Sequence, residues 1–312
     1  MKNGETLLDS QGNPLHAHGG CILESGGWFY WFGEDRRGRI RVSCYRSRDL
    51  LHWEFRNHVL TLDSKTKEHY VRTERLLEKA VITRDQHQIF TGCNLQRPKV
   101  AFCPKTGRYV MWMHYENGAD YSEARCAVAV CDTVDGDYTH LGAFSPIGNM
   151  SRDCTLFVDD DGTAYFISAG RGNADTILYR LSEDFLSIDE QIRILWPGQY
   201  REAAAVFKRN GRYYMLTSGC TGWAPNQGKY AWADRLDGRW SALTDFGDET
   251  TYRSQSAYVL PVGQKYLYIG DRWGGSGQAY FDSGYVFLPL SFREDGSLYL
   301  DWNDDFDGLE AL

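Results

Sequence analysis

The stretch "RDCTLFVDDDGTAYFISAG", residues 152 to 170, has the pattern of two β-strands joined by a turn. Apolar and aromatic residues fill both halves, and Asp159, Asp160, Asp161 and Gly162 lie between them, a composition typical of a hairpin turn. The adjacent aspartates do not follow the calcium-loop pattern, which needs alternating ligands and a distant Glu. We therefore expect a solvent-exposed turn here, with Asp153 set apart at the far end of the first strand.

The same hairpin pattern occurs five times along the chain, with an apolar strand, a turn that contains Gly, and an aromatic strand. The copies cover residues 18–34, 97–114, 152–170, 201–219 and 254–271. The equivalent tyrosines at positions 30, 109, 165, 213 and 266 are 79, 56, 48 and 53 residues apart, which suits one four-stranded unit per copy. The sequence therefore predicts an all-β fold, a five-bladed β-propeller that forms a single domain over 1–312. A β-sandwich is the competing architecture, and residues 72–81 and 180–188 could form helical turns or loops.

A propeller places the innermost strand of every blade along its axis. The polar residues that open the five copies should therefore meet in one central pocket. These residues are His18, Gln96, Arg97, Asp153, Glu202 and Gln255. Each of them alone could simply start a strand, so the prediction depends on their matched positions.

Composition and charge narrow the classes of partner. The 312 residues carry a dispersed formal charge of −8 without a basic stripe, so we expect no nucleic acid as a partner. No segment is long and apolar enough to cross a bilayer, so we expect no membrane partner and a soluble protein. The N-terminus lacks a secretory signal, which predicts a cytoplasmic protein, or a secreted one if the N-terminus has been trimmed. The eight cysteines form no CxxC pair, and we expect reduced thiols.

Several longer phrases carry a family resemblance. They are "AHGGCILESGGWFYWFGED" (17–35), "RPKVAF" (97–102), "SRDCTLF" (151–157), "WPGQYREA" (196–203), "TGWAPNQ" (221–227) and "YRSQSAYVLP" (252–261). From about residue 14 to 290 the chain resembles glycoside hydrolase family 43, and within it the exo-β-1,3-galactanase branch. The resemblance implies a five-bladed propeller that hydrolyses glycosidic bonds with inversion and without a cofactor. Inversion needs a carboxylic acid and a base roughly 6.5 to 9.5 Å apart.

The resemblance also implies roles for two carboxyl groups. Glu202 matches the family's general acid, and burial beside Tyr200 and an apolar run would keep it protonated. Asp153 matches the carboxylate that orients the acid and adjusts its pKa. The alternatives are an ion pair of Glu202 with Arg201 or Arg97, and a turn or cap role for Asp153.

The chain departs from the wider family's pattern at two positions. An Asp followed by Pro is the usual base, and His18 and Gly19 stand there instead. In the galactanase branch, a glutamine that matches Gln255 has been thought to serve as the base through its imidic acid tautomer, although it could equally position a water. Gln96 replaces the Glu that the branch carries before Arg-Pro-Lys-Val, which removes a charge while keeping a hydrogen-bonding tip.

The remaining contacts to the sugar are expected from loops that follow the hairpins. By resemblance they are Glu34, Tyr121, Asn173, Thr221, Trp223 and Asn226, with Trp223 stacking on a sugar face. Simpler roles are also open: Glu34 could pair with Arg36 or Arg37, Asn173 could cap a turn, and Trp223 could pack within a blade. His16 and His18 resemble a pair of metal ligands, but we expect no metal.

The resemblance therefore implies an exo-acting enzyme that releases galactose from a β-1,3-galactan such as the backbone of arabinogalactan. An α-L-arabinofuranosidase or β-xylosidase of the same fold is one alternative, disfavoured by the missing Asp at position 18. A non-hydrolytic galactan-binding propeller is another, motivated by Gln96 and disfavoured by the presence of both Glu202 and Asp153. The expected partner is an oligosaccharide or polysaccharide, and the oligomeric state stays open.

Overall fold

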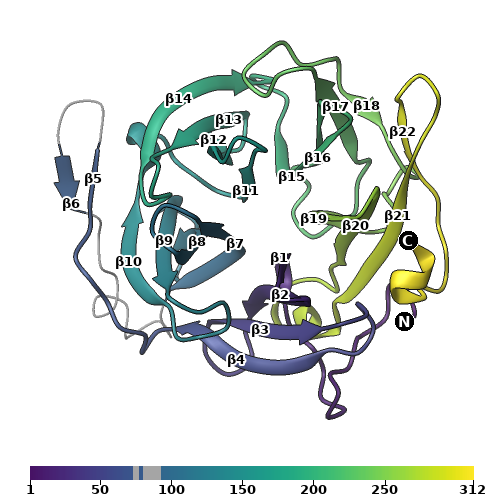
Figure 1. The fold of residues 1–312 in the computed structure, drawn as a ribbon, viewed down its shortest axis with the longest axis horizontal. Coiled ribbons are helices and arrows are strands. Elements are labelled where there is room, and N and C mark those ends of the chain that lie inside the picture. Colours follow the sequence, from purple (N-terminus) through teal and green to yellow (C-terminus); the bar gives the residue numbers. More distant parts are fainter. Residues whose placement is uncertain (73–76, 80–92) are drawn as a thin grey trace.

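Five four-stranded antiparallel sheets surround one axis in the computed structural model, which describes residues 1–72, 77–79 and 93–312 (Figure 1). Blade 1 consists of β1 (His18–Ser25), β2 (Trp28–Asp35), β3 (Arg41–Ser47) and β4 (Glu54–Thr61). Blade 2 consists of β7 (Asn94–Cys103), β8 (Arg108–Glu116), β9 (Arg125–Cys131) and β10 (Thr139–Phe144). Blade 3 consists of β11 (Cys154–Val158), β12 (Ala164–Gly170), β13 (Asp175–Leu181) and β14 (Ile188–Leu195). Blade 4 consists of β15 (Arg201–Arg209), β16 (Arg212–Gly219), β17 (Lys229–Ala233) and β18 (Thr244–Asp245). Blade 5 consists of β19 (Gln255–Val262), β20 (Lys265–Arg272), β21 (Gly284–Phe292) and β22 (Leu298–Leu300).

The architecture confirms the prediction of an all-β, five-bladed propeller. Each sequence copy forms the first hairpin of one blade, so β1, β7, β11, β15 and β19 are the innermost strands (Figure 1). Short 3-10 helices lie at Pro146–Gly148, Gly277–Asp282 and Gly308–Ala311. Among the described residues, no helix is both long enough and apolar enough to cross a membrane.

The two segments considered for helical turns have different outcomes. Residues 180–188 form the end of β13, a turn and the first residue of β14, so no helix is present there. Within 72–81, residues 77–79 form β6 (Leu77–Lys79), which pairs with β5 (Tyr70–Arg72). Residues 73–76 and 80–81 lie outside the described part of the chain.

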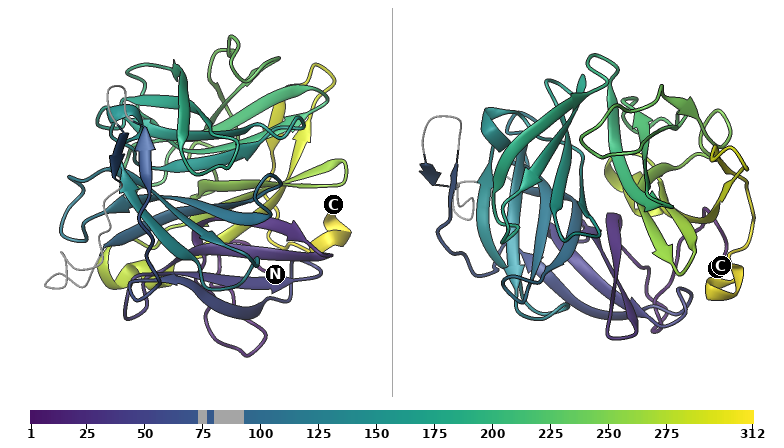
Figure 2. Two further views of the ribbon diagram at one scale, coloured as in Figure 1. Left: turned by 60° about the vertical axis from the view of Figure 1, so that its left-hand side comes forward. Right: turned by 45° about the horizontal axis from the view of Figure 1, so that its top comes forward.

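The apolar core is divided among the interfaces between neighbouring blades. Each of five buried clusters joins side chains from two adjacent sheets. Between blades 2 and 3, for example, the Trp112 and Phe166 rings lie with centroids 4.7 Å apart. The blades pack face to face around the ring (Figure 2). Burial of apolar surface stabilises these interfaces. The polar residues of the inner strands lie at the axis instead.

The N-terminal and C-terminal segments meet beside blade 5 (Figure 1). Lys2 and Asp305 form an antiparallel bridge, and Met1 exchanges backbone hydrogen bonds with Phe306. The buried Asn3 side chain donates to the carbonyls of Phe287 and Asn303. The N-terminal segment, which leads into blade 1, is therefore held against blade 5 and the C-terminal segment.

Four of the five inner strands have an irregular register close to their first residues. The shifts fall between His18 and Cys21, Gln96 and Lys99, Glu202 and Ala205, and Ser256 and Tyr258. A β-bulge changes the direction of a side chain and bends its strand. The left-handed φ values of Gly19, Arg97 and Ala203 (61°, 51° and 55°) lie inside these bulges. The bulges turn polar residues toward the axis where a regular strand would continue its alternation.

Lys99 contacts the bulges of blades 1 and 2 and is buried, with 1% of its surface exposed. Its ammonium group donates to the carbonyl oxygens of Gly19 (2.6 Å) and Arg97 (3.3 Å). Burial lowers the pKa of Lys99 to about 8, and the Arg97 charge also lowers it. The lysine therefore satisfies backbone oxygens that the bulges remove from regular sheet pairing.

The turn with three aspartates connects β11 to β12, as predicted. It is not wholly solvated, however, because Asp159 accepts bonds from Lys208 (2.7 Å) and Tyr213 (2.5 Å) of blade 4. The Asp159 side chain is only 10% exposed, and the lysine holds the pKa of this carboxyl below its usual range despite burial. This part of the turn therefore joins two blades, which corrects the expectation of a solvent-exposed loop.

Candidate active site

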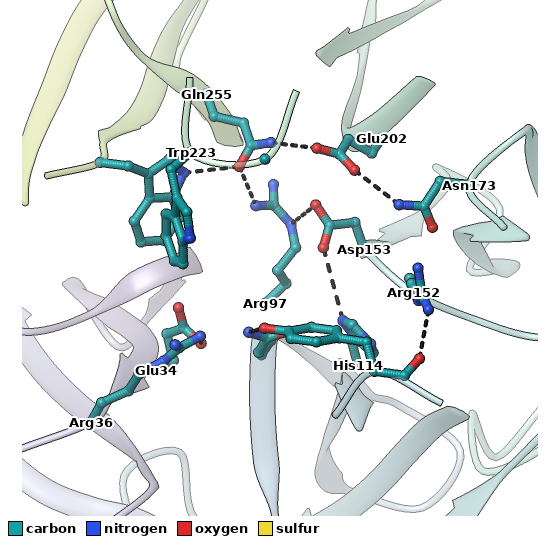
Figure 3. A pocket seen from close by; sticks show the side chains of 14 residues that line it. Glu34, Arg36, Arg97, His114, Arg152, Asp153, Asn173, Glu202, Trp223 and Gln255 are labelled. Carbon is teal, nitrogen blue, oxygen red and sulfur yellow. Dashed lines mark hydrogen bonds and ion pairs between the residues drawn. The ribbon is translucent and has the colours of Figure 1, made fainter. Parts of the chain in front are cut away.

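All five blades contribute to a pocket at the axis, where the inner strands begin (Figure 3). Its volume of about 270 Å³ is close to the lower end of the range for small-molecule sites. The lining residues are Glu34, Arg36, Gln96, Arg97, His114, Tyr121, Arg152, Asp153, Asn173, Glu202, Gly222, Trp223, Gln255 and Trp273. The pocket therefore brings together nine of the twelve residues that the sequence singled out.

Glu202 lies at the start of β15, and two amides donate to its carboxyl group. Gln255 Nε2 lies 3.1 Å from Oε1, and Asn173 Nδ2 lies 3.2 Å from Oε2. Among the described residues no ion pair joins Glu202 to Arg201, whose guanidinium instead donates to Thr217. Glu202 is therefore held by neutral donors, which leaves room for a proton on the carboxyl group.

The surroundings of Glu202 raise its pKa to about 7. Burial is the main cause, because the charged form loses hydration, and the nearby Asp153 carboxylate raises the pKa further. Hydrogen bonds from Cys220 and Gln255 and the charge of Arg97 act in the opposite direction. A carboxylic acid with this pKa is about half protonated in neutral solution and largely protonated in mildly acidic solution, so it can donate a proton there.

Asp153 lies directly before β11, and its side chain is 20% exposed. Arg97 Nε lies 3.7 Å from Oδ2, and His114 Nδ1 lies 3.9 Å from Oδ1 (Figure 3). Arg97 itself is 3% exposed and also reaches the Ser256 carbonyl oxygen. A buried cation from blade 2 thus faces Asp153 across the pocket.

Gln255 connects Glu202 to the opposite wall of the pocket. Its Oε1 accepts from Trp273 Nε1 (2.9 Å) and Arg97 Nη1 (3.4 Å), while its Nε2 donates to Glu202 and to Ser218 Oγ (2.9 Å). Because indole and guanidinium groups only donate, they fix which end of the amide is the oxygen. All four contacts suit the ordinary amide, whereas the imidic acid would place a hydroxyl group opposite two donors.

Glu34 lies at the end of β2 and is 4% exposed. It accepts from Arg36 Nη2 (3.3 Å) and from the Tyr280 hydroxyl (3.1 Å), so the pairing with Arg36 that the sequence left open is present. Trp223 is 38% exposed and meets Trp273 edge to face, with centroids 5.4 Å apart. Trp223 therefore presents free aromatic surface at the mouth of the pocket.

Gln96 and Tyr121 lie together on the wall that blade 2 supplies. Gln96 Nε2 is 2.9 Å from the Tyr121 hydroxyl, and Tyr121 is 42% exposed. The loop that carries Tyr121 is tied to blade 3 by Arg152, which donates to the Tyr121 carbonyl oxygen. Both side chains keep polar atoms that a ligand hydroxyl can reach.

His18 does not line the pocket, which corrects its predicted role. Its ring is fully buried, stacks on Tyr285, and pairs through Nδ1 with Asp271 Oδ1 at 3.0 Å. The other Asp271 oxygen accepts from the Gly19 amide, so the bulge of β1 turns His18 into the interface with blade 5. The His16 ring lies 5.5 Å away in the same interface.

Thr221 and Asn226 also lie outside the main pocket. Thr221 donates to the Ala224 carbonyl oxygen and accepts from Asn226, which in turn bonds both backbone groups of Gly219. Their polar atoms are used to shape the loop that carries Trp223. Asn226 faces a smaller pocket that adjoins the main one.

Five lining residues were missed by sequence reasoning. They are Arg36, His114, Arg152, Gly222 and Trp273. Arg36, His114 and Trp273 lie near the ends of second strands, which return beside the starts of the inner strands. The register pairs His114 with Gln96 and Asp271 with Gln255. An alignment of the five sequence copies that also compared the ends of their second strands would have indicated Arg36, His114 and Trp273.

No group of three or more His, Cys, Asp or Glu side chains is placed to hold a metal ion within 1–72, 77–79 and 93–312. All eight cysteines are free thiols. Cys220, beside Glu202, is the one that is not buried.

The propeller and its axial pocket, with a partly buried carboxyl group beside a second carboxylate, define a carbohydrate-processing class of site. The model of the glycosyl hydrolases family 43 matches residues 98–245. An exo-β-1,3-galactanase structure from Clostridium thermocellum is 44% identical, with a TM-score of 0.87, over 97% of this chain and 65% of that one. An exo-β-1,3-galactanase structure from Phanerochaete chrysosporium, with β-1,3-galactotriose, is 34% identical and has a TM-score of 0.84. The match covers 97% of this chain and 67% of that one. A β-D-galactofuranosidase of Aspergillus niger is 27% identical over 48% of each chain.

The chain belongs to glycoside hydrolase family 43. It spans about half the length of the curated relative and 65% of the Clostridium structure. The predicted family is therefore confirmed, and both solved structures carry the name of the predicted branch.

Proposed function

We propose that this protein is an exo-acting, inverting glycoside hydrolase that releases galactose from the end of a β-1,3-galactan. The observation that carries the proposal is the environment of Glu202, whose pKa of about 7 suits a general acid. The two galactanase structures support the substrate class, because their names give the same activity and one of them holds β-1,3-galactotriose. The small pocket suits one terminal sugar unit.

Glu202 is assigned as the proton donor to the glycosidic oxygen. Asp153 keeps the proton on Glu202 through like-charge repulsion, and Gln255 and Asn173 fix the orientation of the acid. Glu34, Gln96, Arg97, Tyr121 and Trp223 are assigned to the terminal sugar. That Gln255 also supplies the base stays a prediction, and its observed contacts support orientation of the acid.

The proposed function is tested by incubating the protein with β-1,3-galactobiose and with aryl galactoside, arabinofuranoside and xyloside. We expect galactose from the first substrate, with NMR showing the α-anomer as the first product because inversion converts the β-linkage. Preferred cleavage of the arabinofuranoside or xyloside would reassign the specificity. Galactan binding without turnover of any substrate would identify a non-hydrolytic binding propeller instead.

The Gln96→Glu substitution is expected to raise kcat/KM on β-1,3-galactobiose by about tenfold. A carboxylate is a stronger acceptor for a sugar hydroxyl, and a hydrogen bond to a charged group is worth roughly 1.5 to 3 kcal/mol. The Tyr121 hydroxyl, 2.9 Å from Gln96, can donate to the new carboxylate, so the local geometry is retained. Steady-state kinetics at neutral pH provide the measurement.

Gln264→Glu is the matched control, since it adds the same charge at the exposed turn between β19 and β20. It should leave kcat/KM unchanged. Equal rates for wild type and Gln96→Glu would show that the amide at position 96 serves the reaction as well as a carboxylate does.

A further inference from the structure

Three consecutive residues just before β19 have left-handed backbone conformations. The φ values of Thr251, Tyr252 and Arg253 are 53°, 56° and 59°. Such values are uncommon for residues other than glycine, and they are least favourable for a β-branched residue such as threonine. Two residues later the chain reaches Gln255, which contacts the proposed acid. A strained backbone persists only where the surrounding structure compensates for it, and such strain gathers at functional sites.

Several hydrogen bonds hold this left-handed turn in place. Asp248 Oδ1 accepts from the Thr250 amide (3.0 Å) and from the Tyr252 amide (2.6 Å). The Tyr252 carbonyl oxygen accepts from Arg272 Nη2 (2.7 Å), and the Tyr252 hydroxyl donates to the Leu300 carbonyl oxygen (2.9 Å). These bonds fix the turn against blade 5, and none of them uses the side chain of its first left-handed residue.

The side chain of that first residue, Thr251, contacts a different loop. It is 2% exposed, and its hydroxyl group accepts from the Gly228 amide (2.6 Å) and donates to the Asn226 carbonyl oxygen (3.0 Å). A Cβ atom at position 228 would lie 2.7 Å from Thr251 Oγ1, so any side chain there would displace the hydroxyl group. One hydroxyl group thus serves as the partner of two backbone groups in the loop between β16 and β17, residues 220–228.

This loop carries Trp223 to the mouth of the pocket. The Asn226 side chain shapes the loop through hydrogen bonds within it and to the end of β16. A cavity of about 30 Å³, roughly the volume of one water molecule, is lined by residues 222–226 of the loop and by residues 253–255. Trp223 and Gln255 line both this cavity and the main pocket (Figure 3). The loop and the turn therefore do not pack tightly against each other at the cavity, and hydrogen bonds are needed to fix the loop.

We propose that Thr251 is a positioning residue for sugar binding: its hydroxyl group fastens the loop that carries Trp223 to the turn that precedes Gln255. The inference rests on the proposed function, which assigns Trp223 to the terminal sugar. Thr251 is not one of the residues that line the pocket in the described part of the chain, so it acts through the loop. Gln255 has four hydrogen bonds of its own, so loss of this link should weaken binding more than it slows the chemical step.

The Thr251→Val substitution tests this assignment. It removes the hydroxyl group and keeps the β-branched shape, while the Phe246 amide still donates to the Gly228 carbonyl oxygen (3.1 Å) and holds that end of the loop. We expect KM for β-1,3-galactobiose to rise about tenfold and kcat to change less than about twofold, because ground state and transition state lose the same contact. The basic limb of the pH profile, which reports Glu202, should stay in place. A fall in kcat at an unchanged KM would overturn the proposal.

Two further changes at the same position provide the comparison. Thr251→Ser keeps the hydroxyl group and should restore the wild-type KM. Thr251→Gly removes the hydroxyl group together with the strain of the left-handed φ, so the fold is retained while the link to the loop is lost. It should raise KM as Thr251→Val does. A wild-type KM in Thr251→Gly would contradict the role of the hydroxyl group.

A double-mutant cycle with Trp223→Ala separates positioning of the loop from general stability. If Thr251 acts through Trp223, Thr251→Val adds no further rise in KM once the indole ring has been removed. Additive effects of the two substitutions on KM would show that Thr251 has a merely structural role, and would overturn the proposal.

Two measurements without turnover keep this inference distinct from the proposed function. Hydrogen exchange of the Gly228 amide should be about tenfold faster in Thr251→Val than in the wild type, and unchanged in Thr251→Ser. Calorimetry with galactose should give a Kd about tenfold higher in Thr251→Val. A protein that binds galactose in this way but hydrolyses no substrate would refute the proposed function and leave the role of Thr251 intact. Exchange or galactose affinity that does not change in Thr251→Val would overturn the inference, whatever the protein hydrolyses.

Discussion

Replacing Glu202 with Gln is expected to lower kcat on β-1,3-galactobiose by about 10²- to 10⁴-fold, the usual contribution of a general acid. The amide keeps the volume of the side chain but has no proton to transfer to the leaving oxygen. The amide does not ionise, so the basic limb that the Glu202 pKa of about 7 produces should disappear from the pH profile. In the wild type this limb falls as pH rises through about 7, because Glu202 then loses its proton.

A change of leaving group provides the control for Glu202→Gln. An aryl galactoside with a strongly acidic phenol leaves without protonation, so the variant should retain most of the wild-type rate on that substrate. The contrast between the two substrates separates loss of proton donation from misfolding. An equal loss of rate on both substrates would contradict the assignment of Glu202 as the acid.

Asp153→Asn is expected to move the basic limb of kcat/KM to lower pH and to reduce the rate at neutral pH by about tenfold or more. The Asp153 carboxylate raises the pKa of Glu202, so removing its charge lowers that pKa. Each unit of that fall reduces the protonated fraction about tenfold at a pH above the limb. The pH dependence of kcat/KM measured on β-1,3-galactobiose checks the direction of the shift.

The matched control for Asp153→Asn is Asp161→Asn, at the turn of the same hairpin. Asp161 is exposed and, within the described part of the chain, accepts only a local bond from the Thr163 amide. Both limbs of the pH profile should therefore stay in place. Some rate should return to Asp153→Asn in acidic solution, where Glu202 regains its proton. A basic limb that does not move would mean that Asp153 has no influence on the acid.

The propeller was predictable because its signals are local in the sequence. Alternating apolar residues, aromatic second strands and turns such as Asp159 to Gly162 recur five times, and each copy became one inner hairpin. The positions of Gln96, Asp153, Glu202 and Gln255 in that repeat placed them at one pocket. The contact of Asp159 with Lys208 was not predictable, because it joins residues 49 positions apart in different blades.

His18 shows how a matched position can mislead. It opens its repeat as the other polar residues do, but Asp271 of blade 5 binds both its ring and the Gly19 amide and draws the side chain into an interface. The partner lies 253 residues away in the chain, and nothing near position 18 signals it. His114 was missed for the related reason that the carboxylate it faces in the pocket, Asp153, belongs to the next blade.

The sequence by itself determined the number of blades, the hairpin in each, the family, and the two carboxyl groups at the axis. These properties depend on periodicity, turn chemistry and motifs that lie within about twenty residues of one another. Only the tertiary structure decided which polar groups meet, because the bulges of separate inner strands aim side chains at neighbours on other blades. Gln255 and Glu202, 53 residues apart, are joined in this way. The pKa of Glu202 follows from that meeting, since its burial and its closeness to Asp153 exist only once the ring has closed.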